Sequence, residues 1–174
     1  MAAGDFDLTM DELRTVVRFA ADCAEELLPE FDAVAPDDLR PRHAIDAARA
    51  FANGARRSNL QRTAAFASHR AAKDVSDESA QLAALACGDA AAAAYLHPIA
   101  KASQVGHILR AAACAARVTE LRTGTPDSDT VRVLASRATP PLPAILRRYP
   151  EAPSGGSRVS QLMSALDSAI RERD

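Results

Sequence analysis

Asp89 is the residue whose type and surroundings most clearly invite chemistry. It lies in the run from 80 to 96, which is mostly alanine, in the local sequence Gly88-Asp89-Ala90. A carboxylate buried alone is costly, so we expect Asp89 to have a partner or to be protonated. The basic side chains that we consider as its partner are Arg49, Lys101 and His107. Such a pair either locks helices together or forms part of a functional site.

Polar side chains gather just after this run, where Tyr-Leu-His-Pro at 95–98 interrupts the helical pattern. Pro98 has no backbone N–H and disfavours helical geometry at His97. The interruption exposes backbone groups and brings large polar side chains within about three helical turns. We expect a functional surface to draw on the segment 95–110, and its candidate binding residues are Tyr95, His97, Lys101, Gln104 and His107. The alternative is a helix junction whose polar side chains only satisfy backbone groups.

A second candidate site lies at Arg40, Arg42 and His43, which surround a proline. Proline is favoured in the first turn of a helix, and a helix N-terminus with arginines can hold an anion. The alternative is a solvated ladder of charges at helical spacing, in which Arg42, Asp46 and Arg49 pair with one another. Exposed ladders of this kind are common and weak, so we favour the ladder.

Motifs for metal binding, cofactor binding and catalysis are not recognisable in the sequence. The four histidines and Asp89 have no tight ligand spacing, and the three cysteines form no CxxC pair. A Gly-rich phosphate loop, HExxH and the nucleophile elbow are missing as well. We therefore expect no structural zinc and no cofactor, and we assign no catalytic residue. Cys23, Cys87 and Cys114 are predicted to be buried free thiols.

Helices should position all of these residues, because caps and 3.6-residue periodicity recur along the chain without the alternation typical of strands. Thr9-Met10-Asp11-Glu12 and Ser58-Asn59-Leu60-Gln61 have the pattern of capping boxes. The helix expected at 77–96 is apolar on nearly every side, so it belongs in the centre of a bundle. The expected helices run from Thr9 to a kink or end at Pro29, Pro41 to Gly54, Ser58 to about Lys73, Asp77 to Leu96, Pro98 to about Arg122, Asp129 to Ala138, and onward from Ser157, with a short turn at 143–149.

The sequence therefore predicts an all-α fold, a bundle of about six or seven helices around a central alanine-rich helix. The chain has 174 residues, which suits one domain, 1–174. Residues 9–123 are expected to form the core bundle. The proline- and glycine-rich segment and the terminal helix within 124–174 are expected to pack on it. Alanine loses no side-chain entropy in a helix and lets neighbouring helices approach closely.

Charge and hydropathy limit the partners that we expect. The formal net charge of −2 supplies no basic field for nucleic acid or for an acidic membrane. The first residues lack the basic start and apolar stretch of a signal peptide, and the alanine run is too weakly apolar to span a bilayer. We expect a cytoplasmic protein, and self-association into a homo-oligomer stays open.

Six short strings, taken in their order along the chain, resemble a family of small alanine-rich bacterial proteins called putative immunity proteins. The resemblance extends from about Leu13 to Leu121. Many relatives have Gly-His-Ala where this chain has Gly88-Asp89-Ala90, so a histidine-based mechanism is not carried over. The strings are Asp22-Cys23-Ala24-Glu25, Leu28-Pro29, Arg40-Pro41-Arg42-His43-Ala44-Ile45, Ala47-Ala48-Arg49-Ala50-Phe51, Tyr95-Leu96-His97-Pro98 and Gln104-Val105-Gly106-His107-Ile108-Leu109.

The resemblance implies a bacterial binding module that neutralises a cognate toxin by protein–protein contact. It implies no catalytic residue. The alternative function is a small-molecule or metal-binding helical domain, an enzyme among the options, centred on Asp89, His97, Lys101 and His107. A binding module should present an exposed patch, whereas an enzyme should gather polar groups in a cleft.

Overall fold

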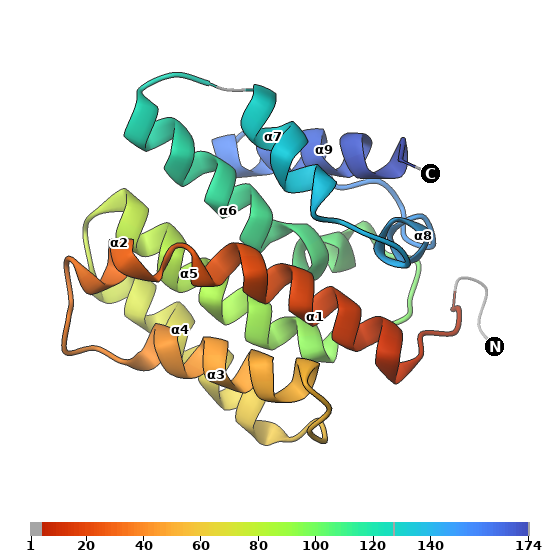
Figure 1. Ribbon diagram of the computed structural model, residues 1–174, viewed down its shortest axis with the longest axis horizontal. Coiled ribbons are helices and arrows are strands. Elements are labelled where there is room, and N and C mark those ends of the chain that lie inside the picture. Colours follow the sequence, from red (N-terminus) through yellow and green to blue (C-terminus); the bar gives the residue numbers. More distant parts are fainter. Residues whose placement is uncertain (1–4, 127, 174) are drawn as a thin grey trace.

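The computed structural model describes residues 5–126 and 128–173, which form a stack of helices (Figure 1). Within those residues there are nine α-helices, two short 3₁₀ helices and no strand, and Asp5 and Ile99 form one isolated β-bridge. The all-α prediction is confirmed, but the predicted number of six or seven helices is too low. The helices are α1 (Met10–Glu25), α2 (Leu28–Asp32), α3 (Arg40–Ala52), α4 (Asn59–Asp74), α5 (Glu78–Ala92), η1 (Ala93–Tyr95), η2 (Ala102–Gln104), α6 (Val105–Thr123), α7 (Ser128–Ser136), α8 (Leu142–Leu146) and α9 (Arg158–Arg171).

Most of the predicted helix starts are present. Thr9 and Ser58 are the N-caps of α1 and α4, and each forms the expected capping box with the residue three positions on. Ser157 caps α9 as predicted, whereas Asp77, predicted as the first residue of its helix, is instead the N-cap of α5; both side-chain oxygens accept backbone N–H groups. Local sequence therefore sets where these four helices begin, because each cap satisfies N–H groups that the first helical turn leaves unpaired.

Three predicted boundaries are wrong, and two of them, the division of the first helix and the short helix α8, account for the extra helices. The first predicted helix is divided, because α1 ends at Glu25 and Pro29 lies in the first turn of the short α2. The helix predicted to begin at Pro98 starts seven residues later, at Val105, after η2. The segment 143–149, predicted as a turn, contains the end of the five-residue helix α8.

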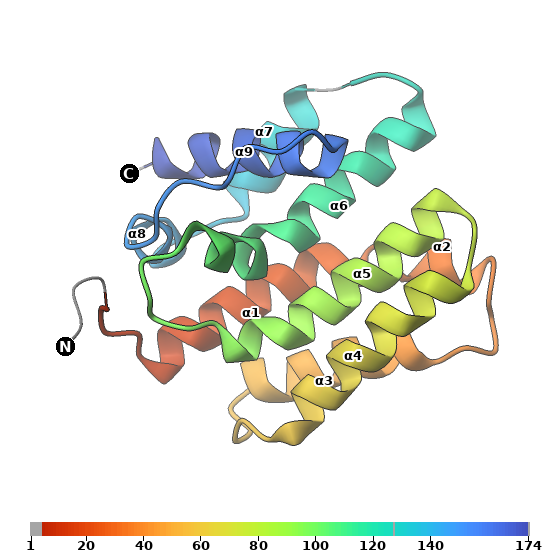
Figure 2. The same ribbon diagram turned by 180° about the vertical axis from the view of Figure 1, so that it is seen from behind.

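The alanine-rich helix α5 occupies the centre of the N-terminal bundle, as its apolar surface predicted. It packs against α1, α2, α3, α4 and α6. Figure 2 shows α4 and α5 side by side, with α6 on the opposite side of α5 from α4. Ten residues of α5 are buried, and Asp89 is the one charged residue among them. Small side chains let five neighbouring helices approach one helix closely.

The C-terminal elements cover the other face of α6. Helix α9 packs on α6 and on α7, and its buried face includes Leu162, Leu166 and Ile170. Glu120 of α6 is buried, and Arg158 of α9 binds its carboxylate through two nitrogens, at 3.0 and 2.5 Å. An apolar stripe and one bidentate ion pair therefore attach the last helix.

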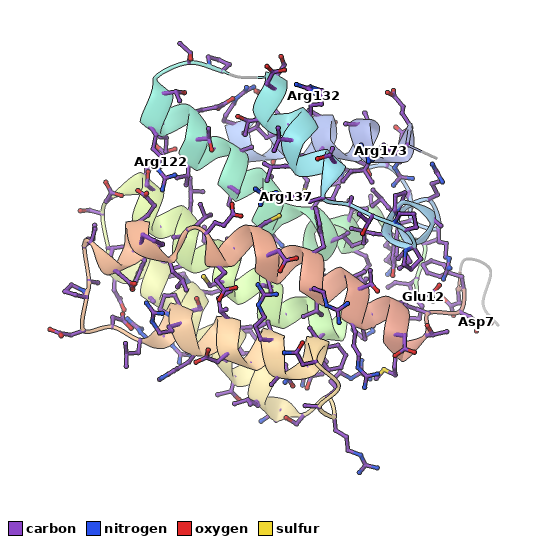
Figure 3. All side chains as sticks on the ribbon, viewed as in Figure 1. Asp7, Glu12, Arg122, Arg132, Arg137 and Arg173 are labelled. Atoms are coloured by element: carbon purple, nitrogen blue, oxygen red, sulfur yellow. The ribbon has the colours of Figure 1, made fainter. Side chains whose placement is uncertain are left out.

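Arginines also join the later elements to the first two helices (Figure 3). Arg122 pairs with Glu30, Arg137 pairs with Glu26 at 2.8 Å, and Arg148 pairs with Glu12 at 2.5 Å. The Arg148 contact holds the pKa of Glu12 at about 2, because hydrogen bonds from Arg148 and from the Thr9 backbone favour the carboxylate. None of the described helices is long and apolar enough to cross a membrane.

Candidate functional site

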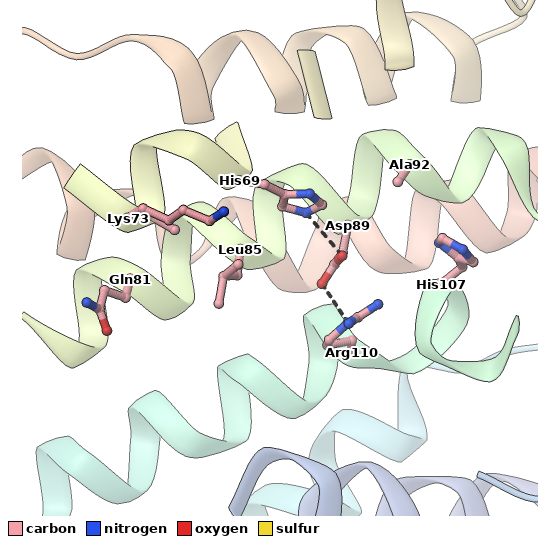
Figure 4. Close-up of a pocket in the computed structure, with 9 residues that line it drawn as sticks. His69, Lys73, Gln81, Leu85, Asp89, Ala92, His107 and Arg110 are labelled. Carbon is pink, nitrogen blue, oxygen red and sulfur yellow. Dashed lines mark ion pairs between the residues drawn. The ribbon is translucent and has the colours of Figure 1, made fainter. Parts of the chain in front are cut away.

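Asp89 is buried and has two basic neighbours, as its position in an apolar helix predicted. The residue is 4% exposed. Its Oδ1 lies 3.2 Å from Nε2 of His69 on α4, and its Oδ2 lies 3.0 Å from Nε of Arg110 on α6 (Figure 4). Asp89 thus links three helices. The candidate partners Arg49 and Lys101 are wrong, because Arg49 pairs with α1 and Lys101 is exposed. The third candidate, His107, is near enough for the Asp89 charge to act on its pKa, but the ion pairs of Asp89 are with His69 and Arg110.

Two glycines inside helices make room for the neighbours of Asp89. A Cβ atom on Gly88 would lie 2.3 Å from Cδ2 of His69, which is closer than real Cβ contacts come. A Cβ atom on Gly106 would lie 3.1 Å from Nη2 of Arg110. Glycine inside a helix costs about 1 kcal/mol relative to alanine. In a chain this rich in alanine, Gly88 is explained by the imidazole that lies against it, whereas the flexible end of Arg110 beside Gly106 could move aside for a side chain.

The three side chains stand in a cleft of about 540 Å³ between α4, α5 and α6. Figure 4 shows Lys73 on the His69 side of Asp89, Arg110 on the other side, and His107 beyond Arg110. The residues that line this cleft are His69, Ala72, Lys73, Gln81, Leu85, Asp89, Ala92, His107 and Arg110.

Polar atoms at this cleft are buried without hydrogen bonds. They are Nε2 of His69, Oδ2 of Asp89 and Nδ1 of His107. The two contacts of Asp89 are short enough for ion pairs, but neither is aligned as a hydrogen bond. Burial lowers the pKa of His107, the Asp89 carboxylate opposes that shift, and Arg110 adds to it. Buried polar groups are nearly always paired, so three such atoms at one cleft point to a group that enters it.

A second cleft of about 250 Å³ adjoins the first, and His69, Ala92 and His107 line both. Its wall is formed by Tyr95, whose ring faces the guanidinium of Arg62 at 4.6 Å. Its remaining lining residues are Ala65, Phe66 and His97. We call the residues that line the two clefts the α4–α6 groove.

The α4–α6 groove has an exposed apolar margin on α4. Phe66 lines the second cleft and is 59% exposed. Large exposed apolar side chains beside a cleft are typical of contact surfaces. The groove therefore combines a polar half around Asp89 with an aromatic half around Phe66 and Tyr95.

The structure gathers four of the residues predicted from the 89–107 region. Asp89, Tyr95, His97 and His107 all line the groove. Lys101 is exposed and lines neither cleft. Gln104 has a structural role at the junction, because its Oε1 accepts the backbone N–H of His97 at 3.0 Å.

Sequence reasoning did not name four basic residues of the groove, Arg62, His69, Lys73 and Arg110, although Arg110 lies within the predicted segment 95–110. Three of them come from α4, which the junction at 95–98 does not predict as a neighbour. Gly88 and Gly106 were the available signals. Each is a helix-interior glycine where alanine is the rule, and each lies against one of the missed side chains.

Arg40, Arg42 and His43 lie at the start of α3, away from the groove. Asp38 accepts both the backbone N–H of Arg40, at 3.1 Å, and its guanidinium, so it takes the place of an external anion. Arg40 also pairs with Asp74, and Arg42 pairs with Asp32. His43 is exposed.

The charge ladder predicted along α3 is wrong. Arg49 pairs with Glu25 and, at 2.6 Å, with Asp22, both on α1, rather than with Asp46 on its own helix. Arg49 therefore joins two helices. An α-helix sequence cannot distinguish a charge that pairs along its own face from one that reaches a neighbouring helix.

Metal-ligating side chains do not cluster in the part of the chain that the structure describes. No group of three or more His, Cys, Asp and Glu residues in it is arranged to hold a metal ion. Cys23, Cys87 and Cys114 are free and buried, as predicted, and burial raises the pKa of each thiol.

Comparison with known proteins shows which family the chain is similar to. A family model described as Imm-5 like putative immunity protein matches residues 7–138, well over half of the chain. The match covers α1 to α7 and so includes the whole α4–α6 groove. No curated protein and no solved structure matches the chain.

Proposed function

Because this chain belongs to the Imm-5 like putative immunity protein family, we propose that it neutralises a cognate toxin by protein–protein contact. The contact surface in this proposal is the α4–α6 groove. The toxin is held in the groove and kept from its target, and the chain itself performs no chemical step.

The observation that carries the choice of surface is the set of buried atoms on His69, Asp89 and His107 that form no aligned hydrogen bond. Those of His69 and Asp89 are held by ion pairs alone. Leaving a buried donor or acceptor unsatisfied costs about 1–3 kcal/mol, so a partner that supplies the missing hydrogen bonds gains affinity. The exposed ring of Phe66 beside these atoms offers apolar area to the same partner. Buried polar groups next to an aromatic anchor are the arrangement found at energetically dominant interface positions.

The test is co-expression with the product of the adjacent gene, followed by co-purification and a measurement of growth. We expect wild-type protein to bind that product and to restore growth. Ala92→Phe places a large ring at a half-buried position where the two clefts meet and should abolish both effects while its melting temperature stays close to that of wild type. Ala50→Phe adds the same ring at an exposed position of α3 and should leave both effects unchanged.

Two results would contradict the proposal. If no toxic partner binds the wild-type chain, the function is wrong. If the partner binds both variants as tightly as it binds wild type, and both variants fold, the function stands but the groove is not the contact surface.

A further inference from the structure

Positive and titratable side chains dominate the α4–α6 groove, although the chain as a whole carries a net charge of −2. Arg62, Lys73 and Arg110 line it as fixed cations. Three of the four histidines of the chain also line it: His69, His97 and His107. Asp89 is the only acidic residue among the lining residues, and both of its oxygens already face basic groups.

We propose that the α4–α6 groove receives an acidic polypeptide segment of the partner. This inference rests on the proposed function and specifies the chemistry of what the groove binds. A carboxylate of the segment lies between Lys73 and Arg110, and an apolar side chain of the segment lies against Phe66 and Tyr95.

Charge selects an acidic segment over a basic one. A lysine or arginine entering the cleft would approach Arg110, Lys73 and, further along, Arg62. The single acid that might attract it, Asp89, is already compensated by His69 at 3.2 Å and Arg110 at 3.0 Å. Juxtaposed like charges at an interface cost several kcal/mol, so a basic segment is excluded.

Hydrogen bonding selects a polypeptide over a small free anion. Nδ1 of His107 can donate to a carboxylate when it carries a proton. Oδ2 of Asp89 faces Nε of Arg110 at 3.0 Å without an aligned hydrogen bond, so it can still accept a hydrogen bond from a donor, which a carboxylate cannot supply. A polypeptide segment supplies both, because its side-chain carboxylates accept hydrogen bonds and its backbone N–H groups donate them.

The shape of the groove agrees with an extended occupant. The polar cleft of about 540 Å³ and the aromatic cleft of about 250 Å³ meet at Ala92, so one chain can place successive side chains in both. Phe66 on one margin is exposed and is available to an apolar side chain of that segment. A small anion would leave the aromatic cleft empty.

The experiment measures binding of short fluorescein-labelled peptides to the full chain by fluorescence anisotropy. One peptide alternates glutamate with leucine, and a second has lysine in place of every glutamate. We expect the acidic peptide to bind and the basic peptide not to bind. Because fixed charges on both sides attract, we also expect the affinity for the acidic peptide to fall as salt is added.

Variants locate the interaction. Lys73→Glu should weaken binding of the acidic peptide by about fivefold, and Lys73→Glu with Arg62→Glu by roughly tenfold or more. Arg132→Glu is the matched control, because it changes the net charge equally at an exposed position on α7, outside the groove. Its affinity should stay within about twofold of wild type. Thermal melting establishes that each variant is folded.

Equal binding of the acidic and basic peptides, or equal losses in Lys73→Glu and Arg132→Glu, would overturn the inference. Repeating the measurement with the toxic partner separates the two proposals. If the partner binds wild type and the double variant equally, the acidic-segment inference fails while the neutralising function stands. If no partner binds, the neutralising function fails, and the peptide measurements alone test whether the groove prefers an acidic segment.

Discussion

At the scale of single residues, the site depends on a glycine as well as on its charged groups. Gly88 borders Asp89 in sequence and faces the ring of His69 in space. Without the gap that Gly88 leaves, the imidazole cannot lie beside the carboxylate. The geometry of the site therefore depends on the absence of a side chain in a helix otherwise filled with alanine.

Gly88→Ala should destabilise the protein, although the same change at an exposed helical position would stabilise it by about 1 kcal/mol. The new Cβ would lie 2.3 Å from His69, and overpacking of this kind costs about 1–3 kcal/mol. Urea denaturation gives the free energy of unfolding. Gly106→Ala is the control, because the flexible end of Arg110 can move away from it. A Gly88→Ala variant as stable as wild type would show that His69 is free to leave.

Arg110 should matter more to stability than the acid that it neutralises. Arg110→Met leaves Asp89 with only His69 for compensation and should lower the free energy of unfolding by about 1–3 kcal/mol. Asp89→Leu removes the buried charge and should cost less. The double variant should recover part of the loss, and a double-mutant cycle from denaturation curves measures the coupling. Additive losses would mean that the two side chains do not interact.

His107 should make the protein less stable in mild acid. Its folded-state pKa lies below the usual 6.5, mainly because it is buried, and Asp89 only partly offsets burial and the charges of Arg110, His97 and His69. The unfolded chain therefore binds a proton more readily than the folded one. Stability should fall as the pH decreases through about 6.5 and on to the folded-state pKa. In His107→Asn the melting temperature should change less with pH over this range. If it changes as much as in wild type, another group causes the pH dependence.

At the scale of helices, the sequence predicted what is encoded locally and failed where distant residues decide. Thr9, Ser58 and Ser157 are recognisable caps because each contacts an N–H only a few residues away. The late start of α6, by contrast, is accompanied by a contact with a residue distant in the sequence. The segment from 97 to 101 is an extended connection, and its Pro98 carbonyl accepts the backbone N–H of Phe6, which precedes α1.

The candidate site, too, could be predicted only where the signal lies in residues close together in the sequence. Asp89 was found because one carboxylate in an apolar helix must have a partner, but the partner itself could not be found. His69 and Arg110 approach Asp89 from two other helices, and no spacing within one helix encodes that meeting. Tyr95, His97 and His107 were found because the junction that they flank is a local feature.

Replacing Arg158 should weaken the attachment of helix α9 to α6. Arg158 holds the buried carboxylate of Glu120, and that contact lowers the carboxyl pKa. Arg158→Met leaves Arg117, at 3.4 Å, as the remaining partner of Glu120. Hydrogen exchange should then speed up in α9 while exchange in α5 stays slow. Uniformly faster exchange would show instead that α9 unfolds together with the whole chain.

At the scale of the molecule, arginines tie the end of the chain to its beginning, and acid should loosen that tie. The pKa of Glu12 is about 2 in the folded protein because Arg148 binds it, against 4.5 for a free glutamate. The stabilisation is present above 4.5 and is lost as the pH falls toward 2. Glu12→Gln, which keeps an acceptor for the cap, should be less sensitive to pH in that range. Identical acid unfolding curves would contradict this.

The buried alanines of α5 also restrict how a protein of this design can change partners. Larger side chains at the buried positions of α5 would push five neighbouring helices apart, so nearly every substitution at those positions should lower the stability of the protein. The side chains of α4 that border the groove, such as Arg62, Phe66 and Lys73, are exposed and can vary at little cost. If the proposed toxin partner changes during evolution, we expect the sequence of α5 to stay nearly constant and the exposed positions of α4 to vary.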